Sequence, residues 1–430
     1  MNHSEAVAYL DAHVGAGIKP GLDRIRLLVE SMGSPHLGYP TIHVAGTNGK
    51  TSTTRLSSLL LVAHGLSTGS YISPHLERIE ERLGVNGRIA TPDEFALAVS
   101  DVAAFAEILE ERGEAQFSYF ELTTAMAFAF FVEQAVEAAV VEVGLGGRLD
   151  ATNVIEADVA VLTGVSLEHT EYLGTTVEAI AAEKLAIAGP DSILVTGPLE
   201  PAVAGAAAET ARRLGIEHRA YGRDFSVSAR RAVGGWAVDI RGAEDEYGEV
   251  VLGVHGRHQT VNAAVSVAAV EALLGRGLDV EAVRESGAAF TTPGRMEPVA
   301  TGPLVMLDGA HNAEGVGVLA RGLAEEFSSV RWVLVLGVMG DKDVEAMVAA
   351  LGDRIESVVT TAAQGERAIP AAELAGRVAA VLSVPVEAGG DPPAALEVAR
   401  SLAGEEGAVL VTGSLYLVGE VRAAMELPAQ

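Results

Sequence analysis

The chain has 430 residues, of which 49% are hydrophobic and 20% charged, a composition that excludes general disorder and predicts a globular protein of two domains. Its formal net charge of −28, with no local run of basic residues, argues against nucleic acid or an anionic membrane as a partner. The absence of cysteine excludes disulfides, thiolate metal sites and cysteine nucleophiles.

The N-terminal segment lacks the basic flank and apolar core of a secretion leader. The longest apolar stretch near residues 125–132 ends at Glu133, far short of a membrane span. We therefore expect a cytoplasmic protein.

In chain order, the first clear pattern is an apolar strand at residues 41–45, a glycine-bearing turn and a helix from about Thr51 to His64. The turn reads Gly46-Thr47-Asn48-Gly49-Lys50-Thr51-Ser52. A phosphate-binding loop needs unobstructed backbone N–H groups, a lysine for the terminal phosphates and a hydroxyl that reaches a magnesium ion, and this segment has all three. Strict Walker spacing would require glycine where the chain has Val44. The alternative is a glycine turn that only caps the helix.

Apolar runs at residues 138–143, 159–165 and 193–196 have the length and β-branched content of buried parallel strands, with helical stretches between them. They predict a doubly wound, mostly parallel sheet. Glu142 lies at the carboxyl end of the first run, where such sheets bind ligands, and a lone acid there suits magnesium. The alternative is a carboxylate that caps the following turn. By themselves His169, in a polar loop, and Lys184, in a helix, indicate little.

Between residues 220 and 254 the pattern changes to short strands around Gly234-Gly235, which predicts a small antiparallel patch. After about Pro298 the alternation of strand and helix begins again and predicts a smaller, Rossmann-like α/β domain. We therefore predict two domains, residues 1–298 and 299–430.

In the second domain, Asp308 and His311 follow an apolar strand and are expected to face the cleft between the domains. This pair is a candidate to orient a substrate or the nucleotide. Asn312 is also a plausible N-cap of the next helix, an interpretation compatible with the first.

The 30 basic residues include only four lysines: Lys19, Lys50, Lys184 and Lys342. Three of them, all but Lys19, lie inside the motif-like segments. A chain that otherwise uses arginine retains lysine where a compact or deprotonated amine is needed, although codon bias with chance survivors explains the same pattern.

The order of several segments resembles one family. They are AGTNGKTS, ISPHLERIEERL, YFELTTAMAF, EVGLGGRLDATN, LEHTEYLG, EKLAI, HQTVNAA, PGRMEP, DGAHN, GDKD and VTGSLYLVGE. Together they resemble the folylpolyglutamate synthase and dihydrofolate synthase family of Mur-type ligases over residues 20–420. The resemblance implies a phosphate-loop domain, a second α/β domain and an ATP-dependent ligation of L-glutamate to dihydropteroate, to reduced folates or to both.

The resemblance also implies roles for particular residues. Nucleotide contacts are implied for Asn48, Gly49, Lys50, Thr51, Ser52, Asn262, Arg295 and Asp308. Magnesium ligands, for two ions, are implied at Thr51, Ser73, Glu142, His169 and Lys184, with Lys184 as an N6-carboxylysine. The pterin-side pocket is implied at Ser118, Tyr119, Phe120, Glu121, Leu149, Asp150 and Ala151. Residues near the incoming glutamate are implied at His311, Ser414 and Tyr416. Among all these, Lys50, Lys184, Asp308 and His311 are the residues to which we assign catalysis.

The chain departs from the family pattern at three places. Thr51 stands where many members have glycine, Glu168 where the usual residue is aspartate, and EKLAI where EKAGI is usual. The longer arm of Glu168 puts any supporting role of that position in doubt.

Two other functions are consistent with parts of the pattern. One is a Mur-type ligase for cell-wall precursors, which we would expect to lack the GLGGRLDATN segment. The other is a non-catalytic nucleotide-binding protein, against which Lys50, Glu142, His169 and Lys184 all argue. We expect a monomer that binds only small molecules.

Overall fold

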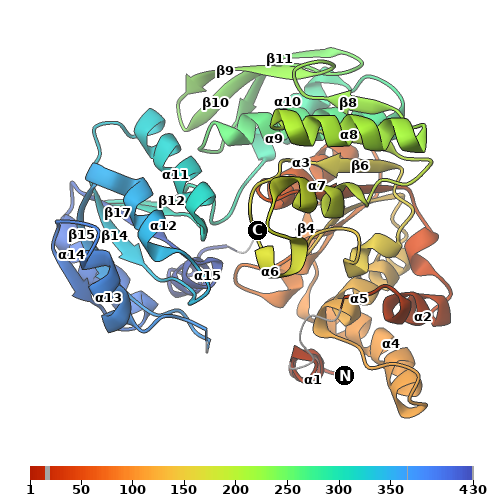
Figure 1. Ribbon diagram of the computed structural model, residues 1–430, viewed down its shortest axis with the longest axis horizontal. Coiled ribbons are helices and arrows are strands. Elements are labelled where there is room, and N and C mark those ends of the chain that lie inside the picture. The colour runs from red at the N-terminus through yellow and green to blue at the C-terminus, as the bar shows by residue number, and fades with distance from the viewer. Residues whose placement is uncertain (15–19, 366, 429–430) are drawn as a thin grey trace.

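The computed structural model describes residues 1–14, 20–365 and 367–428, which form two α/β bodies side by side (Figure 1). Lys19 lies outside the described residues. Among the residues described, no helix is both long enough and apolar enough to cross a membrane.

The larger sheet has eight strands in the order β4-β3-β2-β5-β1-β6-β7-β8. The strands are β1 (Thr41–Ala45), β2 (Thr68–Tyr71), β3 (Leu83–Val85), β4 (Arg88–Ile89), β5 (Ala138–Glu142), β6 (Val159–Leu162), β7 (Ile193–Thr196) and β8 (His218–Ala220). The six strands from β2 to β8 in this order run parallel, whereas β3 and β4 form an antiparallel edge. Strands β1 and β5 are buried along their whole length, which explains their continuous apolar sequence.

Helices cover both faces of this sheet. The helices of this body are α1 (His3–Asp11), α2 (Asp23–Ser31), α3 (Lys50–Ala63), α4 (Pro92–Glu111), α5 (Tyr119–Glu133), α6 (Thr170–Leu173), α7 (Val177–Leu185), α8 (Pro201–Leu214), α9 (His258–Leu274) and α10 (Val280–Ala289). Alternate residues of β5 point into different cores: Val141 packs with the helices α4 and α5, and Val140 packs with α3 and α9. The doubly wound arrangement expected from the sequence is therefore confirmed.

The antiparallel patch predicted between residues 220 and 254 is also present. It consists of β9 (Ser226–Ala232), β10 (Gly235–Arg241) and β11 (Glu246–Leu252), and it lies along the top of Figure 1 beside α9 and α10. Gly234 has a φ of 72°, the left-handed conformation that the tight turn between β9 and β10 needs. Trp236, Val238 and Ile240 of β10 pack against α9, so the patch extends the core of the first body.

The second sheet has six strands in the order β12-β13-β17-β14-β15-β16. Its elements are β12 (Glu297–Thr301), β13 (Leu304–Leu307), α11 (Ala313–Glu326), β14 (Trp332–Leu336), α12 (Val344–Leu351), β15 (Ile355–Thr360), α13 (Ala371–Ala379), β16 (Val386–Ala388), α14 (Pro392–Ala403), β17 (Ala408–Thr412) and α15 (Leu415–Ala424). Only β12 is antiparallel to its neighbour. Pro298 lies inside β12, and the domain division at residue 298 stays a prediction.

Candidate active site

A cavity of about 180 Å³ opens between the two sheets. Its lining from the first body follows the ends of strands β1, β2, β5 and β6, and its lining from the second follows the ends of β13 and β17. These are the carboxyl ends of parallel strands, which is where open α/β sheets bind their ligands. Both bodies therefore present their ligand-binding edges to one space.

The loop between β1 and α3 has the geometry of a phosphate-binding loop. Gly49 has a φ of +87°, and a Cβ there would lie 2.6 Å from Oδ1 of Asn262, so no side chain fits. The end of β6 holds the loop, because the Thr163 hydroxyl donates to the carbonyl oxygen of Asn48 at 2.7 Å and Thr47 N donates to Gly164 O at 2.9 Å. Since Gly49 offers no side-chain oxygen to cap α3, the first N–H groups of the helix remain available to an anion.

Lys50 lies at the start of α3 and lines the cavity. Its amine donates to the carbonyl oxygens of Gly46 at 3.0 Å and Thr47 at 3.1 Å. It therefore sits folded over the loop, beside the place where the phosphates of a nucleotide would lie.

Three oxygen-bearing side chains lie together at the ends of β1, β2 and β5. Thr51 Oγ1 donates to Glu142 Oε1 at 3.0 Å, and the backbone N of Ser73 donates to Glu142 Oε2 at 3.3 Å. The Ser73 hydroxyl is buried and has no hydrogen-bond partner among the residues described. Burial raises the pKa of Glu142 to about 7, against the opposing charge of Lys50.

This cluster fits a magnesium ion. All three groups are hard oxygen donors, and magnesium is usually held by one or two carboxylates together with substrate phosphates and water. In the described part of the chain no group of three or more histidine, aspartate or glutamate side chains is arranged like a metal site, so an all-protein cage is not what the cluster offers. The buried, unpartnered Ser73 hydroxyl is the feature that points to a missing ligand.

Lys184 lies directly behind the phosphate loop. Its buried amine contacts Glu168 Oε1 at 2.6 Å and donates to Gly46 O at 2.9 Å. Burial lowers the pKa of this amine to about 8, and the neighbouring Lys50 adds to the effect. His169, the residue after Glu168, lines the cavity with a φ of 44°. A carbamate at Lys184 would place an anion beside Glu168 and so calls for a cation between the two.

Asp308 joins segments on the second side of the cavity. Its Oδ2 accepts from the backbone N of Met296 at 2.9 Å, and its Oδ1 accepts from Ala310 N at 2.8 Å. Arg295 lines the cavity, while Asp308 itself lies behind it, and burial raises the pKa of that carboxyl against the charge of Arg295. Asn262 also lies behind the loop, where its Nδ2 donates to Gln259 Oε1 at 2.9 Å.

Of the residues expected near glutamate, only His311 lines the cavity. Its Nδ1 donates to Gly309 O at 2.9 Å, which leaves Nε2 as the acceptor nitrogen, and burial lowers its pKa to about 4. Ser414 is buried and caps α15 by accepting from Tyr416 N at 3.2 Å. The side chain of Tyr416 is exposed outside the cavity.

The residues expected on the pterin side do not line this cavity. Ser118 and Glu121 form a capping box at the start of α5, and Arg24 pairs with Glu121 at 3.0 Å. Tyr119 has the guanidinium of Arg82 over its ring at 5.3 Å, and the Phe120 ring approaches Gly144 so closely that no Cβ fits there. Leu149 is partly exposed, whereas Asp150 and Ala151 are buried.

A series of buried hydrogen bonds supports the loop at residues 144–151. Thr152 Oγ1 donates to Asp150 Oδ1 at 2.5 Å, so it must accept from His43 Nε2 at 2.8 Å. Asp150 Oδ2 in turn accepts from Leu145 N at 2.8 Å. His43 lies in β1, and these hydrogen bonds therefore connect the strand before the phosphate loop with the loop after β5.

Lowering the pH should destabilise the protein through His43. Burial lowers the pKa of this histidine to about 3, whereas in an unfolded chain histidine titrates near about 6.5. Between those values the unfolded chain binds a proton that the folded protein excludes. The free energy of unfolding should therefore fall as the pH drops from about 6.5, by up to about 1.4 kcal/mol per pH unit. Urea unfolding at pH 7 and pH 5 should show a smaller loss for His43→Asn than for wild type; equal losses would count against this assignment.

Residues that were not identified from the sequence also lie at or beside the cavity, and three of them have charged or ionisable side chains with informative positions. His75 lines the cavity and accepts from Arg82 Nε at 3.0 Å through its Nδ1; its adjacency to Ser73 was the available signal. Arg55 lines the cavity one helical turn after Thr51. Glu314 of α11 accepts from Asn48 Nδ2 at 2.8 Å and from the Ser166 hydroxyl. This contact joins the two bodies, and no local sequence pattern predicts it.

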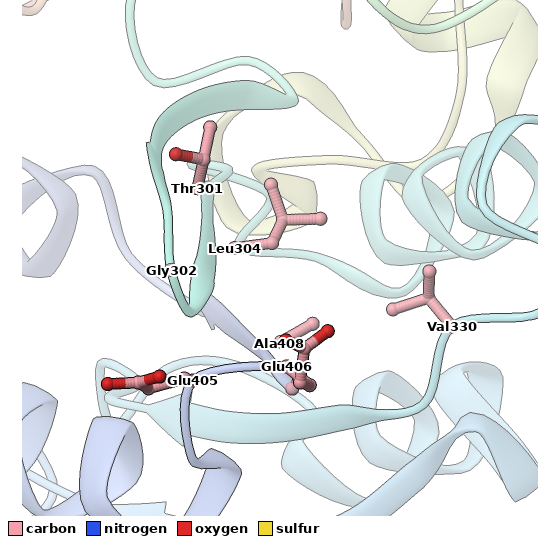
Figure 2. Close-up of a pocket in the computed structure, with 8 residues that line it drawn as sticks. Thr301, Gly302, Leu304, Val330, Glu405, Glu406 and Ala408 are labelled. Atoms are coloured by element: carbon pink, nitrogen blue, oxygen red, sulfur yellow. The ribbon is translucent and has the colours of Figure 1, made fainter.

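A second hollow, of about 430 Å³, lies at the opposite end of the second sheet (Figure 2). It is bordered by the turn between β12 and β13, by Val330 and by the segment before β17. Its ionisable lining residues are Glu405 and Glu406, both exposed. This hollow presents no lysine, arginine, histidine or buried carboxylate, whereas the cavity between the sheets has all four, so we place the candidate active site between the sheets.

Comparison with known proteins finds matches to both bodies. The Mur ligase middle domain matches residues 44–270, and the Mur ligase glutamate ligase domain matches residues 294–415. A protein named dihydrofolate synthase/folylpolyglutamate synthase from Mycobacterium tuberculosis is 40% identical over an alignment of 376 residues that covers 83% of this chain and 77% of the relative.

Two solved structures share the whole arrangement. Mycobacterium tuberculosis folylpolyglutamate synthase complexed with ADP superposes with a TM-score of 0.94 at 36% identity, covering 100% of this chain and 99% of that one. Escherichia coli FolC in complex with DHPP and ADP gives a TM-score of 0.87 at 28% identity, covering 99% and 98%.

Proposed function

Because the chain belongs to the folylpolyglutamate synthase and dihydrofolate synthase family of Mur ligases, we propose that it is a bifunctional synthase that adds L-glutamate to dihydropteroate and to tetrahydrofolates. The chain is an ATP-dependent ligase that releases ADP and phosphate. The observation that carries the proposal is one cavity in which the phosphate loop of the first body faces Arg295 and, from the second body, His311.

The nucleotide would lie with its phosphates on the loop from Asn48 to Ser52. The first N–H groups of α3 and the amine of Lys50 supply positive charge there, and Arg295 supplies it from the other side. Asn262 and Asp308 are assigned supporting contacts, because each lies directly behind a segment that faces the nucleotide.

Thr51, Ser73 and Glu142 would hold the magnesium ion that accompanies ATP. His169 and a carbamate on Lys184 are proposed as ligands of a second ion. When bound, such ions offset the negative charge of the terminal phosphates. The protein's own contribution is to fix the oxygen donors at the ends of neighbouring strands.

The reaction proceeds in two steps. A carboxylate oxygen of the acceptor attacks the γ-phosphorus of ATP, ADP leaves, and an acyl phosphate forms. The amine of glutamate then attacks the acyl carbon, the C–O bond to phosphate breaks, and the nitrogen gives up a proton as the amide forms. Lys50 and Arg295 stabilise charge on the transferred phosphoryl group, and closing the two bodies over the cavity excludes water that would hydrolyse the acyl phosphate.

The acceptor is proposed to occupy the side of Ser118–Glu121 and Leu149–Ala151, beyond Gly144 at the cavity edge. The glutamate is proposed to bind near His311, whose Nε2 is the nitrogen free to accept from its amine, with Ser414 and Tyr416 further along α15. We further propose that the protein works as a cytoplasmic monomer and that residues 1–298 and 299–430 are its two domains.

The metal assignment predicts a defined loss in Glu142→Gln. This variant keeps the shape of the side chain but removes the carboxylate charge, so the magnesium concentration needed for half-maximal ADP formation should rise by about 10- to 100-fold. Removing metal with EDTA should abolish turnover of the wild type. An unchanged magnesium requirement in Glu142→Gln would contradict the assignment.

A phosphate-release assay tests the proposed function against a non-catalytic nucleotide-binding protein. With magnesium and ATP, phosphate release should require both a pterin-bearing acid and L-glutamate, and mass spectrometry should show an acceptor one glutamyl unit heavier. Tight ADP binding with no release under any combination would favour the binding protein instead.

A further inference from the structure

A buried arginine outside the cavity connects two of the segments that line it. Arg422 lies on α15, and 1% of its side chain is exposed. Its Nε pairs with Glu77, its Nη1 pairs with Glu297, and its Nη2 donates to Pro428 O at 2.9 Å. Every nitrogen of the guanidinium is therefore engaged, and the two carboxylates come from different parts of the chain.

Glu77 belongs to the loop at residues 73–82, which carries Ser73 and His75 into the cavity. This loop is internally stiff, because the carboxylate of Glu81 accepts from the backbone N atoms of Leu76 at 2.8 Å, Glu77 at 3.0 Å and Arg78 at 2.8 Å. A shift of Glu77 is therefore passed on to the rest of the loop.

The same loop packs against the second body. The side chain of Leu76 contacts the hydrophobic cluster beneath α15, and its carbonyl oxygen lies so close to Gly419 of α15 that a Cβ at that glycine does not fit. The loop is thus a first-body segment seated on a second-body helix.

Glu297 belongs to the second segment. Its Oε2 accepts from Gly294 N at 2.8 Å, and residues Thr292, Pro293 and Arg295 line the cavity. Glu297 therefore fixes the segment that presents Arg295 to the proposed phosphates, and Arg422 ties this segment to the loop of Ser73.

We propose that Arg422 is a positioning residue, which holds the Ser73 loop and the Arg295 segment in the mutual arrangement that the closed cavity needs. This inference rests on the proposed ligase function. A guanidinium is suited to the task because its planar fork binds two carboxylates in fixed directions, which a lysine cannot do. The pair of Arg422 with Glu77 also joins the two bodies across the cavity edge.

Three variants test the proposal. Arg422→Met removes both pairs, Glu77→Gln removes the charge from the link to the Ser73 loop and leaves the pair with Glu297, and Arg377→Met removes the exposed pair with Glu345 as a matched control. We expect kcat/KM to fall by about 10- to 100-fold in the first two and to stay unchanged in the control. The double variant Arg422→Met/Glu77→Gln should lose no more kcat/KM than Arg422→Met alone, because Arg422→Met already breaks the pair with Glu77.

Two further measurements separate positioning from simple stabilisation. Hydrogen exchange of the backbone at residues 73–82 should rise in Arg422→Met and Glu77→Gln under conditions where both are folded. Calorimetric binding of ADP should weaken in both variants when magnesium is present. Without magnesium it should stay unchanged in Glu77→Gln, because that variant leaves the pair of Arg422 with Glu297 that holds the Arg295 segment.

A folded Arg422→Met with wild-type kcat/KM and wild-type hydrogen exchange overturns the proposal, whether or not its melting temperature is lower. If Arg422→Met does not fold, Glu77→Gln decides by the same criteria. Failure of the ligase function is distinguishable, because the wild type itself would then show no turnover while the exchange measurement still reports on the loop.

Discussion

Replacing Lys184 by alanine should abolish ligation and leave the protein folded. The amine lies behind the phosphate loop, 2.6 Å from Glu168 and 2.9 Å from the carbonyl oxygen of Gly46. If it carries a carbamate, alanine removes an oxygen donor to the metal, which is expected to cost about 100-fold or more in turnover. The measurement is ADP formation at saturating ATP and magnesium, with circular dichroism to confirm folding.

Lys184→Arg is the matched variant, because arginine keeps the positive charge beside Glu168 but cannot be carbamylated. The carbamate hypothesis predicts that Lys184→Arg is as inactive as Lys184→Ala, that added formate or acetate partly restores Lys184→Ala, and that wild type takes up labelled carbon dioxide. Wild-type-like turnover in Lys184→Ala removes the hypothesis, and an active Lys184→Arg replaces it with a role for the ammonium group.

Lys50→Ala should be the second severe variant. Lys50 is the lysine of the phosphate loop, and its amine lies beside the carbonyl oxygens of Gly46 and Thr47, within the cavity. Loss of a preorganised charge at a transferring phosphoryl group is expected to lower kcat by about 10²- to 10³-fold. ADP formation measures this effect, and labelled ADP binding shows how much of it is ground-state affinity.

The control for Lys50 is Arg331→Ala, which removes an exposed cation paired with Glu356. It should leave kcat unchanged, which excludes a general effect of net charge. Lys50→Arg should also be poor, because the guanidinium is too broad for the loop. Near-normal kcat in Lys50→Ala would mean that the loop binds nucleotide without taking part in phosphoryl transfer.

The interior strands and several helices were predictable because their signals are local. Strands β1 and β7 occupy the predicted ranges, since a buried parallel strand is a continuous apolar run, and Asn312 caps α11 through its side chain as expected. The edge strands β3, β4 and β16 were not predicted. They are two or three residues long, too short to show a period.

Strand β2 was missed for a different reason. Its sequence, TGSY, has small and polar residues, because the ring of Phe131 lies where a side chain at Gly69 would point. The apolar surface that marks a buried strand is supplied here by the helix above it, so the strand itself carries no signal.

The site residues also fall into those with a local sequence signal and those without one. The phosphate loop and Glu142 follow from strand, turn and helix patterns within a few residues. The contact of Glu314 with Asn48 and the pair of Arg422 with Glu77 join residues 266 and 345 positions apart, so they depend on how the two bodies close. The pattern Ser118-x-x-Glu121 is a capping box in the structure, and its part in a pterin pocket stays a prediction.

The measurement that tests the central claim most directly is ADP formation by the purified wild type with magnesium, ATP and L-glutamate, with dihydropteroate in one reaction and tetrahydrofolate in the other. The account predicts turnover with both acceptors, each dependent on glutamate and each lost in Lys50→Ala. Turnover with one acceptor would reduce the bifunctional synthase to a single function. No turnover with either, by a folded protein that binds ADP, would contradict the account.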